Sequence, residues 1–204
     1  AHALGTESNN TFAGNFGISG CFSFYPTKQI TTGEGGMLTT NNYSFYKKVK
    51  KLKAFGIDKD IDKRKKQGTY NVQLLGYNYR MTDFQAAMGY NQILNYKKNL
   101  QLRKKLAFLY SKILSNNSNI KLPKFDKESS YFIFQIFIKK NIRDKILKFF
   151  KNNGIGVSIH YAKPIPDMIY YKKKYKLNLN NFNNSKIYAD TNISLPISEY
   201  MSVE

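Results

Sequence analysis

The chain carries, at residues 21–40, the sequence CFSFYPTKQITTGEGGMLTT. The residues from Ser23 to Thr27 predict a strand that leads into a turn around Pro26. The run GEGG is flanked by ITT and MLTT, which predicts a hairpin turn with positive φ angles. This run is not a phosphate-binding loop of the GxxxxGK[ST] type, because it has neither that spacing nor a following helix.

Lys28 stands almost alone among uncharged residues. From Ser8 to Tyr46 the only charged side chains are Lys28 and Glu34, and a segment so poor in charge predicts burial. Burial disfavours the charged form of an amine, which a nucleophilic lysine requires. The residues alone leave two interpretations open, a nucleophile or a surface lysine in a turn. Ser23 could hold a phosphate, although a turn or core hydroxyl is the commoner role.

The charge of the chain first suggests nucleic acid as a partner. Thirty-three Lys and Arg residues against 13 Asp and Glu give a formal charge of +20. However, 29 of these cations are Lys and only four are Arg, beside 22 Asn. Arg is the usual choice for forked contacts to phosphates and bases, so we interpret the excess as compositional and expect no nucleic acid. A basic nucleic-acid-binding module, whose affinity would fall steeply with salt, stays as the alternative.

Several classes of site and compartment are disfavoured by composition. The single cysteine, Cys21, cannot form an internal disulfide, and with His2 and His160 it makes no convincing zinc site, so we expect no metal. No apolar run approaches the roughly 20 residues of a membrane helix, and we expect no membrane association. The predicted compartment is the cytoplasm.

Helical patterns follow the hairpin region. Residues 47–53 predict a solvated helix face, and the charged run at 57–68 predicts a surface loop. Apolar residues recur at three- and four-residue spacings from Thr82 to about Leu114, which predicts the longest helix. Thr82 and Gln85 form a capping-box pattern at its start.

The last third of the chain reads as a layered α/β unit. Its aromatic and β-branched runs predict strands, and its amphipathic run predicts a helix closed by Gly154. The expected order is a strand at 129–138, a helix at 141–154, a strand at 155–161, a polar loop at 172–185 and a short final strand at 193–197.

Taken in order, five segments resemble the DegT/DnrJ/EryC1/StrS family of pyridoxal-phosphate-dependent sugar aminotransferases. They are AHALG (1–5), the quoted stretch (21–40), LGYNYRMTDFQAAMGYNQI (75–93), GIGVSIHY (154–161) and ISLPI (193–197). The resemblance implies an α/β fold of type I, like that of aspartate aminotransferase. Residues 1–81 would then be the end of the large cofactor-binding domain, and 82–204 the small C-terminal domain opened by the long helix.

The resemblance also assigns roles around pyridoxal 5'-phosphate. It implies that Lys28 forms the Schiff base and moves protons, and that Ser23 binds the cofactor phosphate. His2 would sit beside the pyridoxal ring, although without the resemblance a core histidine would be favoured. Asn78 would reach the cofactor phosphate of the partner subunit, so that a homodimer shares its sites.

The implied activity is amino transfer, from glutamate, to a keto carbon of a nucleotide-linked sugar. Arg80 and His160 are the substrate-binding candidates, and a salt bridge at the helix start is an equal alternative for Arg80. The family's later Pro-x-His is Pro164-Ile165-Pro166 here. Related enzymes that dehydrate sugars carry histidine in place of the Schiff-base lysine, so Lys28 argues against that activity.

One implied residue falls outside the sequence. In the family, an acidic residue that pairs with the pyridine nitrogen stands just before the AHALG segment, and so before Ala1. We therefore expect this chain to be the C-terminal portion of a longer enzyme and to be inactive alone. A catalytically inactive relative with a regulatory role is the remaining alternative.

Overall fold

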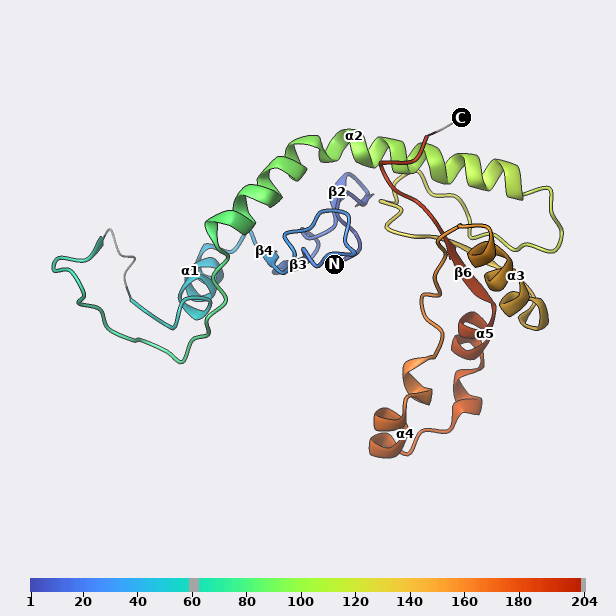
Figure 1. The fold of residues 1–204 in the computed structure, drawn as a ribbon. Helices are drawn as coiled ribbons and strands as arrows, with labels where there is room; N and C mark the ends of the chain where they lie inside the picture. Colours follow the sequence, from blue (N-terminus) through green and yellow to red (C-terminus); the bar gives the residue numbers. More distant parts are fainter. Residues whose placement is uncertain (59–62, 203–204) are drawn as a thin grey trace. The chain divides into compact units, whose positions relative to one another are not determined.

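The computed structural model describes residues 1–58 and 63–202 (Figure 1). It divides into two compact units, Ala1–Lys97 and Lys98–Glu204, which are treated separately below. The boundary that we predict at residues 81 and 82 refers to the domains of a complete enzyme, and it stays a prediction. Among the described residues, no helix is both long and apolar enough to cross a bilayer.

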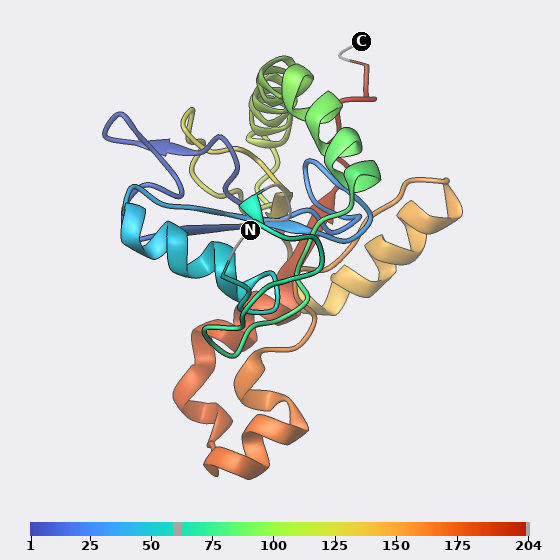
Figure 2. The same ribbon diagram turned by 90° about the vertical axis from the view of Figure 1, so that its left-hand side faces the viewer.

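The first unit is built on a hairpin followed by a basic helix. Strands β3 (Gly20–Ser23) and β4 (Gly36–Thr39) pair antiparallel, with Ser23 opposite Gly36, which confirms the predicted hairpin. Gly33 and Gly35 in the loop have φ angles of 75° and 151°, as expected. Helix α1 (Tyr43–Leu52) lies beside this hairpin (Figure 2). A smaller hairpin, β1 (Glu7–Ser8) and β2 (Thr11–Phe12), precedes it.

The prediction that the charge-poor segment 8–46 is buried is wrong for this chain. Phe16, Ile18 and Met37 are 63%, 72% and 55% exposed. A two-stranded sheet has two faces to cover, and among the described residues of this unit there are too few elements to cover both.

Helix α2 (Asp83–Leu114) confirms the predicted long helix, including its start. The backbone N–H of Gln85 donates to Thr82 Oγ1 (3.3 Å), and the backbone N–H of Thr82 donates to Gln85 Oε1 (3.0 Å). This reciprocal pair is the capping box that the sequence indicates. The first half of the helix belongs to the first unit and the second half to the second unit.

The second unit has a core of its own. Strands β5 (Phe134–Phe137) and β6 (Asn192–Leu195) pair antiparallel, with Ile136 opposite Ile193. One face of this pair packs into a buried cluster of Ala107, Tyr131, Phe134, Ile136, Ile138 and Ile193. Tyr110 packs at its edge and donates its hydroxyl to Pro196 O (2.9 Å), and burial raises the pKa of this tyrosine.

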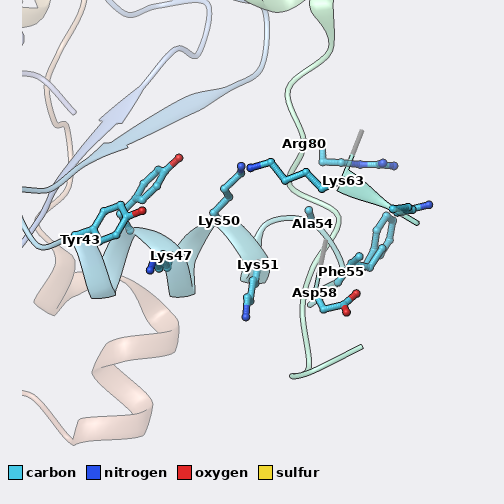
Figure 3. A pocket seen from close by; sticks show the side chains of 12 residues that line it. Tyr43, Lys47, Lys50, Lys51, Ala54, Phe55, Asp58, Lys63 and Arg80 are labelled. Atoms are coloured by element: carbon cyan, nitrogen blue, oxygen red, sulfur yellow. The ribbon is translucent and has the colours of Figure 1, made fainter. Parts of the chain in front are cut away.

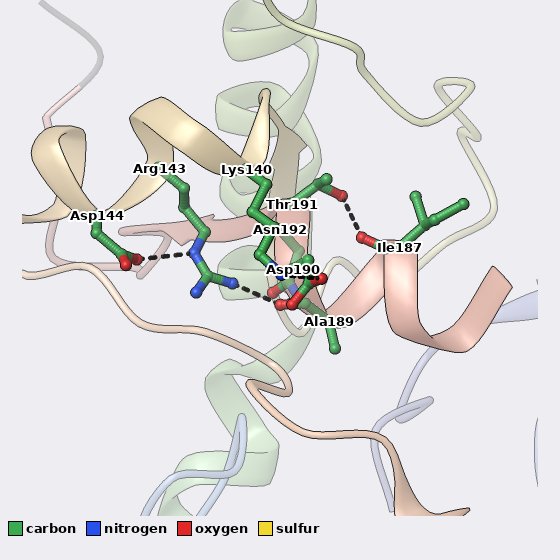
Figure 4. Close-up of polar contacts among 8 residues, drawn as sticks. All are labelled: Lys140, Arg143, Asp144, Ile187, Ala189, Asp190, Thr191 and Asn192. Atoms are coloured by element: carbon green, nitrogen blue, oxygen red, sulfur yellow. Dashed lines mark hydrogen bonds and ion pairs between the residues drawn. The ribbon is translucent and has the colours of Figure 1, made fainter. Parts of the chain in front are cut away.

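Helix α3 (Lys140–Asn152) follows β5 and helix α5 (Asn183–Thr191) precedes β6. Helix α3 ends before Gly154, which has a φ of 70°, and this confirms the predicted helix and its terminus. Polar contacts join α3 to α5, as Figure 4 shows. Lys140 Nζ lies 2.7 Å from Asp190 Oδ2, and Arg143 Nη1 donates to Ala189 O (2.5 Å).

Two local predictions are wrong. Residues 155–161 form no strand, because only Ser158 pairs with β6, through an isolated bridge to Ser194. The segment 172–185, predicted as a loop, is largely helical because caps such as Asn178, whose side chain accepts from Asn180 N (3.0 Å), start short helices within polar sequence. These elements, with the turn before them, are η2 (Ile165–Asp167), α4 (Ile169–Tyr175), η3 (Leu179–Phe182) and the start of α5. Within the predicted loop at 57–68, residues 59–62 lie outside the described residues.

Candidate active site

Lys28 lies in a turn directly after β3. Its backbone N–H donates to Tyr25 O (2.9 Å), which closes the turn that Pro26 begins. Lys28 is half-buried, and the next two residues, Gln29 and Ile30, are buried at 7% and 5% exposure. The lysine is therefore at the rim of a fixed loop, with its main chain anchored on both sides.

Helix α2 holds this loop from the other side through two glutamines. Gln92 Oε1 accepts from Thr31 N (2.9 Å), and its Nε2 donates to Thr31 O (2.6 Å), which imitates a strand pairing. Gln85 Nε2 donates to Glu34 O (2.8 Å). Because these contacts bind the main chain on the C-terminal side of Lys28, the position of the amine depends on α2 as well as on β3.

Lys28 and His2 meet in space although 26 residues separate them. Lys28 Nζ lies 2.7 Å from His2 Nε2, within hydrogen-bond distance. His2 is exposed, so the core histidine that the residues alone would favour is not what the structure contains. Ser23 is at the end of β3, half-buried, and its Oγ accepts from Tyr25 N (3.4 Å).

Asn78 and Arg80 form a second group within the first unit. The segment that carries them pairs with the chain after α1, through Phe55 N to Tyr77 O and Tyr79 N to Lys53 O, both 2.9 Å. Arg80 Nε donates to Asn78 Oδ1 (3.3 Å), and its guanidinium lies 4.8 Å from the Phe55 ring centroid.

This second group has limited contacts. Within the described part of the chain, Arg80 makes no ion pair, so the salt bridge considered for it is absent there. Likewise, Asn78 makes no hydrogen bond to Lys28, His2 or Ser23 among the described residues.

Two glycines allow the backbone after α1 to lie close to the backbone just before Asn78. Gly56 has a φ of 71°, and a Cβ at this position would collide with the carbonyl oxygen of Leu74. A Cβ at Gly76 would collide with the backbone of Gly56. Only residues without a side chain fit at this crossing, so the two glycines set the path of the main chain toward Asn78 and Arg80.

A basic cavity of about 570 Å³ lies beside α1 (Figure 3). Two of its cations have partners on the protein: Lys47 Nζ lies 4.4 Å from the Tyr43 ring centroid, and Lys51 bonds to Gln73 Oε1. Figure 3 shows Lys50 on one side of the helix and Lys47 and Lys51 on the other. The lysines of α1 therefore point in different directions.

His160 lies in the second unit and is held by a polar network. Its Nδ1 is 2.8 Å from Ser194 Oγ, and its backbone N–H donates to Asn192 Oδ1 (3.0 Å). Gln135 Nε2 donates to the His160 carbonyl oxygen (2.9 Å). The neighbouring Tyr161 is 61% exposed. Our sequence reasoning missed Gln135, Asn192 and Ser194, although the alternation of polar and apolar residues in FQIF and NISL could have revealed them.

Comparison with known proteins identifies the family of this chain. The model of the DegT/DnrJ/EryC1/StrS aminotransferase family matches residues 1–204. A protein of Campylobacter jejuni, named UDP-4-amino-4,6-dideoxy-N-acetyl-beta-L-altrosamine transaminase, is 32% identical over 100% of this chain and 54% of its own length.

Solved structures of other proteins have the same fold. PseC of Helicobacter pylori, described as an aminotransferase in the biosynthesis of pseudoaminic acid, superposes with a TM-score of 0.87 at 28% identity, over 100% of this chain and 54% of that one. The sugar aminotransferase Spr1654 of Streptococcus pneumoniae, in its PMP form, has a TM-score of 0.88 at 26% identity, with the same coverage.

This chain therefore spans about half the length of the proteins that it matches. The high structural similarity over that half confirms the expected α/β architecture of type I transaminases. The order of the motifs, the turn that carries Lys28 and the family match all agree, and the chain belongs to the DegT/DnrJ/EryC1/StrS aminotransferase family.

Proposed function

We propose that the complete polypeptide containing this chain is a pyridoxal-phosphate-dependent aminotransferase that moves an amino group, from glutamate, to a keto carbon of a nucleotide-linked sugar. The observation that carries the proposal is the Lys28 amine held 2.7 Å from His2 at the end of β3, in a chain of this family. The C. jejuni relative is named for a UDP-linked amino sugar, which supports the substrate class. Nothing in the comparisons favours nucleic-acid binding.

The chemistry of the available groups fits the proposed cofactor. The primary amine of Lys28 can condense with an aldehyde. The Ser23 hydroxyl can donate to a phosphate oxygen while its lone pair accepts from Tyr25 N. Asn78 Oδ1 is occupied by Arg80, which leaves its amide N–H groups to donate to a phosphate. Spr1654 has also been solved in a PLP form, which supports the same cofactor here.

Each residue then has a role in the reaction. When bound, pyridoxal phosphate supplies an aldehyde that condenses with amines and a ring that accepts an electron pair. Lys28 Nζ is the base that accepts the α-proton of the amino donor and returns a proton to the sugar carbon. His2 orients this amine, and Arg80 and His160 bind the sugar nucleotide, whose diphosphate suits a cation.

A homodimer with shared sites is part of the proposal. Asn78 makes no hydrogen bond to Lys28, His2 or Ser23 within the described chain, as expected if it serves the site of the partner subunit. We further propose that the enzyme acts in the cytoplasm, where Cys21, the single cysteine of this chain, stays reduced.

Trapping with borohydride tests the proposal directly. The complete polypeptide is mixed with pyridoxal phosphate, reduced and digested, and the labelled peptide is identified by mass spectrometry. We expect the label on Lys28 and a visible absorption band that glutamate bleaches. Lys28→Ala should lose both signals, whereas Lys53→Ala, a lysine change in the same unit, should keep them.

Three outcomes would reject parts of this function. A label on another side chain, or no label, would remove Lys28 from its role. A band that glutamate leaves unchanged would favour the inactive, regulatory relative. Binding of DNA or RNA that weakens steeply with salt, in the absence of any band, would favour the nucleic-acid-binding module.

A further inference from the structure

The β5–β6 pair has one apolar and one polar face. Successive side chains of a strand point to opposite faces, so Ile193 enters the core while Asn192 and Ser194 point the other way. Gln135 lies opposite Ser194 in the register and shares this polar face. Asn192 is fully buried and Ser194 is 5% exposed, and buried polar groups are costly unless they are hydrogen-bonded.

The polar face satisfies its hydrogen bonds with His160. Asn192 Oδ1 accepts the His160 backbone N–H (3.0 Å), Gln135 donates to the His160 carbonyl (2.9 Å), and Ser194 Oγ lies 2.8 Å from Nδ1. Two of these three side chains are fixed in turn, because Asn192 Nδ2 donates to Tyr188 O (2.7 Å) and the Tyr188 hydroxyl bonds to Gln135 Oε1. Both main-chain groups of His160 and one ring nitrogen are therefore held.

The other ring nitrogen is available. Within residues 1–58 and 63–202, Nε2 of His160 makes no hydrogen bond, while the ring packs edge-to-face on Tyr161 with centroids 5.3 Å apart. A side chain fixed on several sides, with one polar atom unused, needs little further ordering to meet a ligand. The Ser194 hydroxyl can donate to Nδ1 or accept from it, so this contact holds the plane of the ring in either tautomer.

We infer that Gln135, Asn192 and Ser194 are positioning residues that orient His160 Nε2 toward the sugar nucleotide. Asn192 and Gln135 fix the main chain, and Ser194 fixes the ring plane. This inference rests on the proposed function, because it takes His160 as a substrate-binding residue. It goes beyond that function because it assigns part of the affinity for the sugar nucleotide to side chains of β5 and β6 that act through His160.

Ser194→Ala in the complete polypeptide tests the inference. The change removes the contact to Nδ1 and leaves intact the main-chain pairing of Ser194 with Ser158. Ser158→Ala is the matched control, since Ser158 lies at the same bridge and its side chain makes no hydrogen bond to His160 among the described residues. Ser194→Thr keeps a hydroxyl and should restore the original behaviour.

The first readout does not depend on activity. The ¹⁵N shifts of the imidazole nitrogens report the hydrogen bonds of the ring, and the variants His160→Gln and His2→Gln identify the signals of these two histidines in the complete polypeptide by their loss. We expect Ser194→Ala to shift the Nδ1 signal of His160, because this nitrogen loses its hydrogen bond, and to leave the His2 signals unchanged. The second readout is kinetic: KM for the keto sugar nucleotide should rise about tenfold, a loss of about 1.4 kcal/mol in binding, while the half-reaction with the amino donor keeps its rate.

The outcomes distinguish a failure of the proposed function from a failure of the positioning role. A wild-type polypeptide that transfers no amino group would reject the proposed function itself. An active wild type, combined with unchanged His160 shifts in Ser194→Ala, would overturn the positioning role alone. A changed His160 signal with an unchanged KM would also overturn it, because the network would then be purely structural.

Discussion

The two units differ in how they are held together. In the second unit, Phe134, Ile136 and Ile193 are at most 3% exposed and belong to one continuous cluster. In the described part of the first unit, the buried apolar residues are Phe24, Ile30 and Tyr96, and no comparable cluster joins them. The first unit depends instead on hydrogen bonds such as those from Gln92 to Thr31.

The first unit also leaves an apolar surface open. A cavity of about 560 Å³ lies between the β3–β4 hairpin and α2, with Phe22, Met37 and Ile93 among its lining residues. Exposed apolar patches of this kind mark surfaces that another polypeptide covers. Lys28 and His2, at the proposed cofactor site, therefore lie in the first unit, whereas the continuous buried cluster lies in the second unit. The chain as a whole spans about half the length of its relatives.

Hydrogen exchange on the 204-residue chain gives the largest expected contrast. Amides paired between β5 and β6 should exchange at least about a hundredfold more slowly than those paired between β3 and β4, because exchange follows the stability of the local cooperative unit. Peptide-resolved mass spectrometry would measure this. Equal protection of the two hairpins would break the comparison.

A core substitution should act on the second unit alone. Ile193→Ala removes buried methyl groups from a fully enclosed site and should cost about 3 kcal/mol in the free energy of unfolding, measured by urea denaturation. Leu75→Ala is the control, because Leu75 is 85% exposed and its truncation should cost less than about 0.5 kcal/mol. A large effect at Leu75 would show that the first unit has a core after all.

A glycine substitution tests how firmly the first unit sets its local geometry. Gly56→Ala adds a Cβ against Leu74 O at a φ of 71°, and it should destabilise this crossing by about 1 to 2 kcal/mol. The Gln73 amide, which donates to Gly56 O (2.9 Å), should then exchange about tenfold faster. Gly17→Ala, where a Cβ would meet nothing, should leave this amide unchanged.

The smallest effect concerns alkaline pH. Burial raises the pKa of Tyr110 above its ordinary value of 10.0, so the folded state keeps this proton longer than the unfolded state does. The contribution to stability is complete below pH 10 and is lost as the pH rises through the raised value. Tyr110→Phe should flatten the fall in unfolding free energy above pH 10, and Tyr200→Phe, at a 91% exposed position, should not.

The sequence could predict elements whose signals are local. The capping box at Thr82 and Gln85, the glycine terminus at Gly154 and the turn that carries Lys28 all depend on a few adjacent residues, and all are confirmed. The strand predicted at 155–161 failed because its pairing depends on a partner far along the chain, and only Ser158 meets Ser194. The contact of His2 with Lys28 was not predicted, since no local pattern joins residues 26 apart; the family resemblance implied only that His2 would sit beside the pyridoxal ring.

The register of β6 determines both the packing of the core and the position of His160 in the second unit. Ile193 supports the hydrophobic core, while Asn192 and Ser194 hold His160, and the three residues are consecutive. Deleting a single residue just before β6 would exchange the two faces, placing amide and hydroxyl groups in the core and isoleucine against the imidazole. Homologues should therefore tolerate insertions and deletions in the helical segments before β6 far better than within the strand itself.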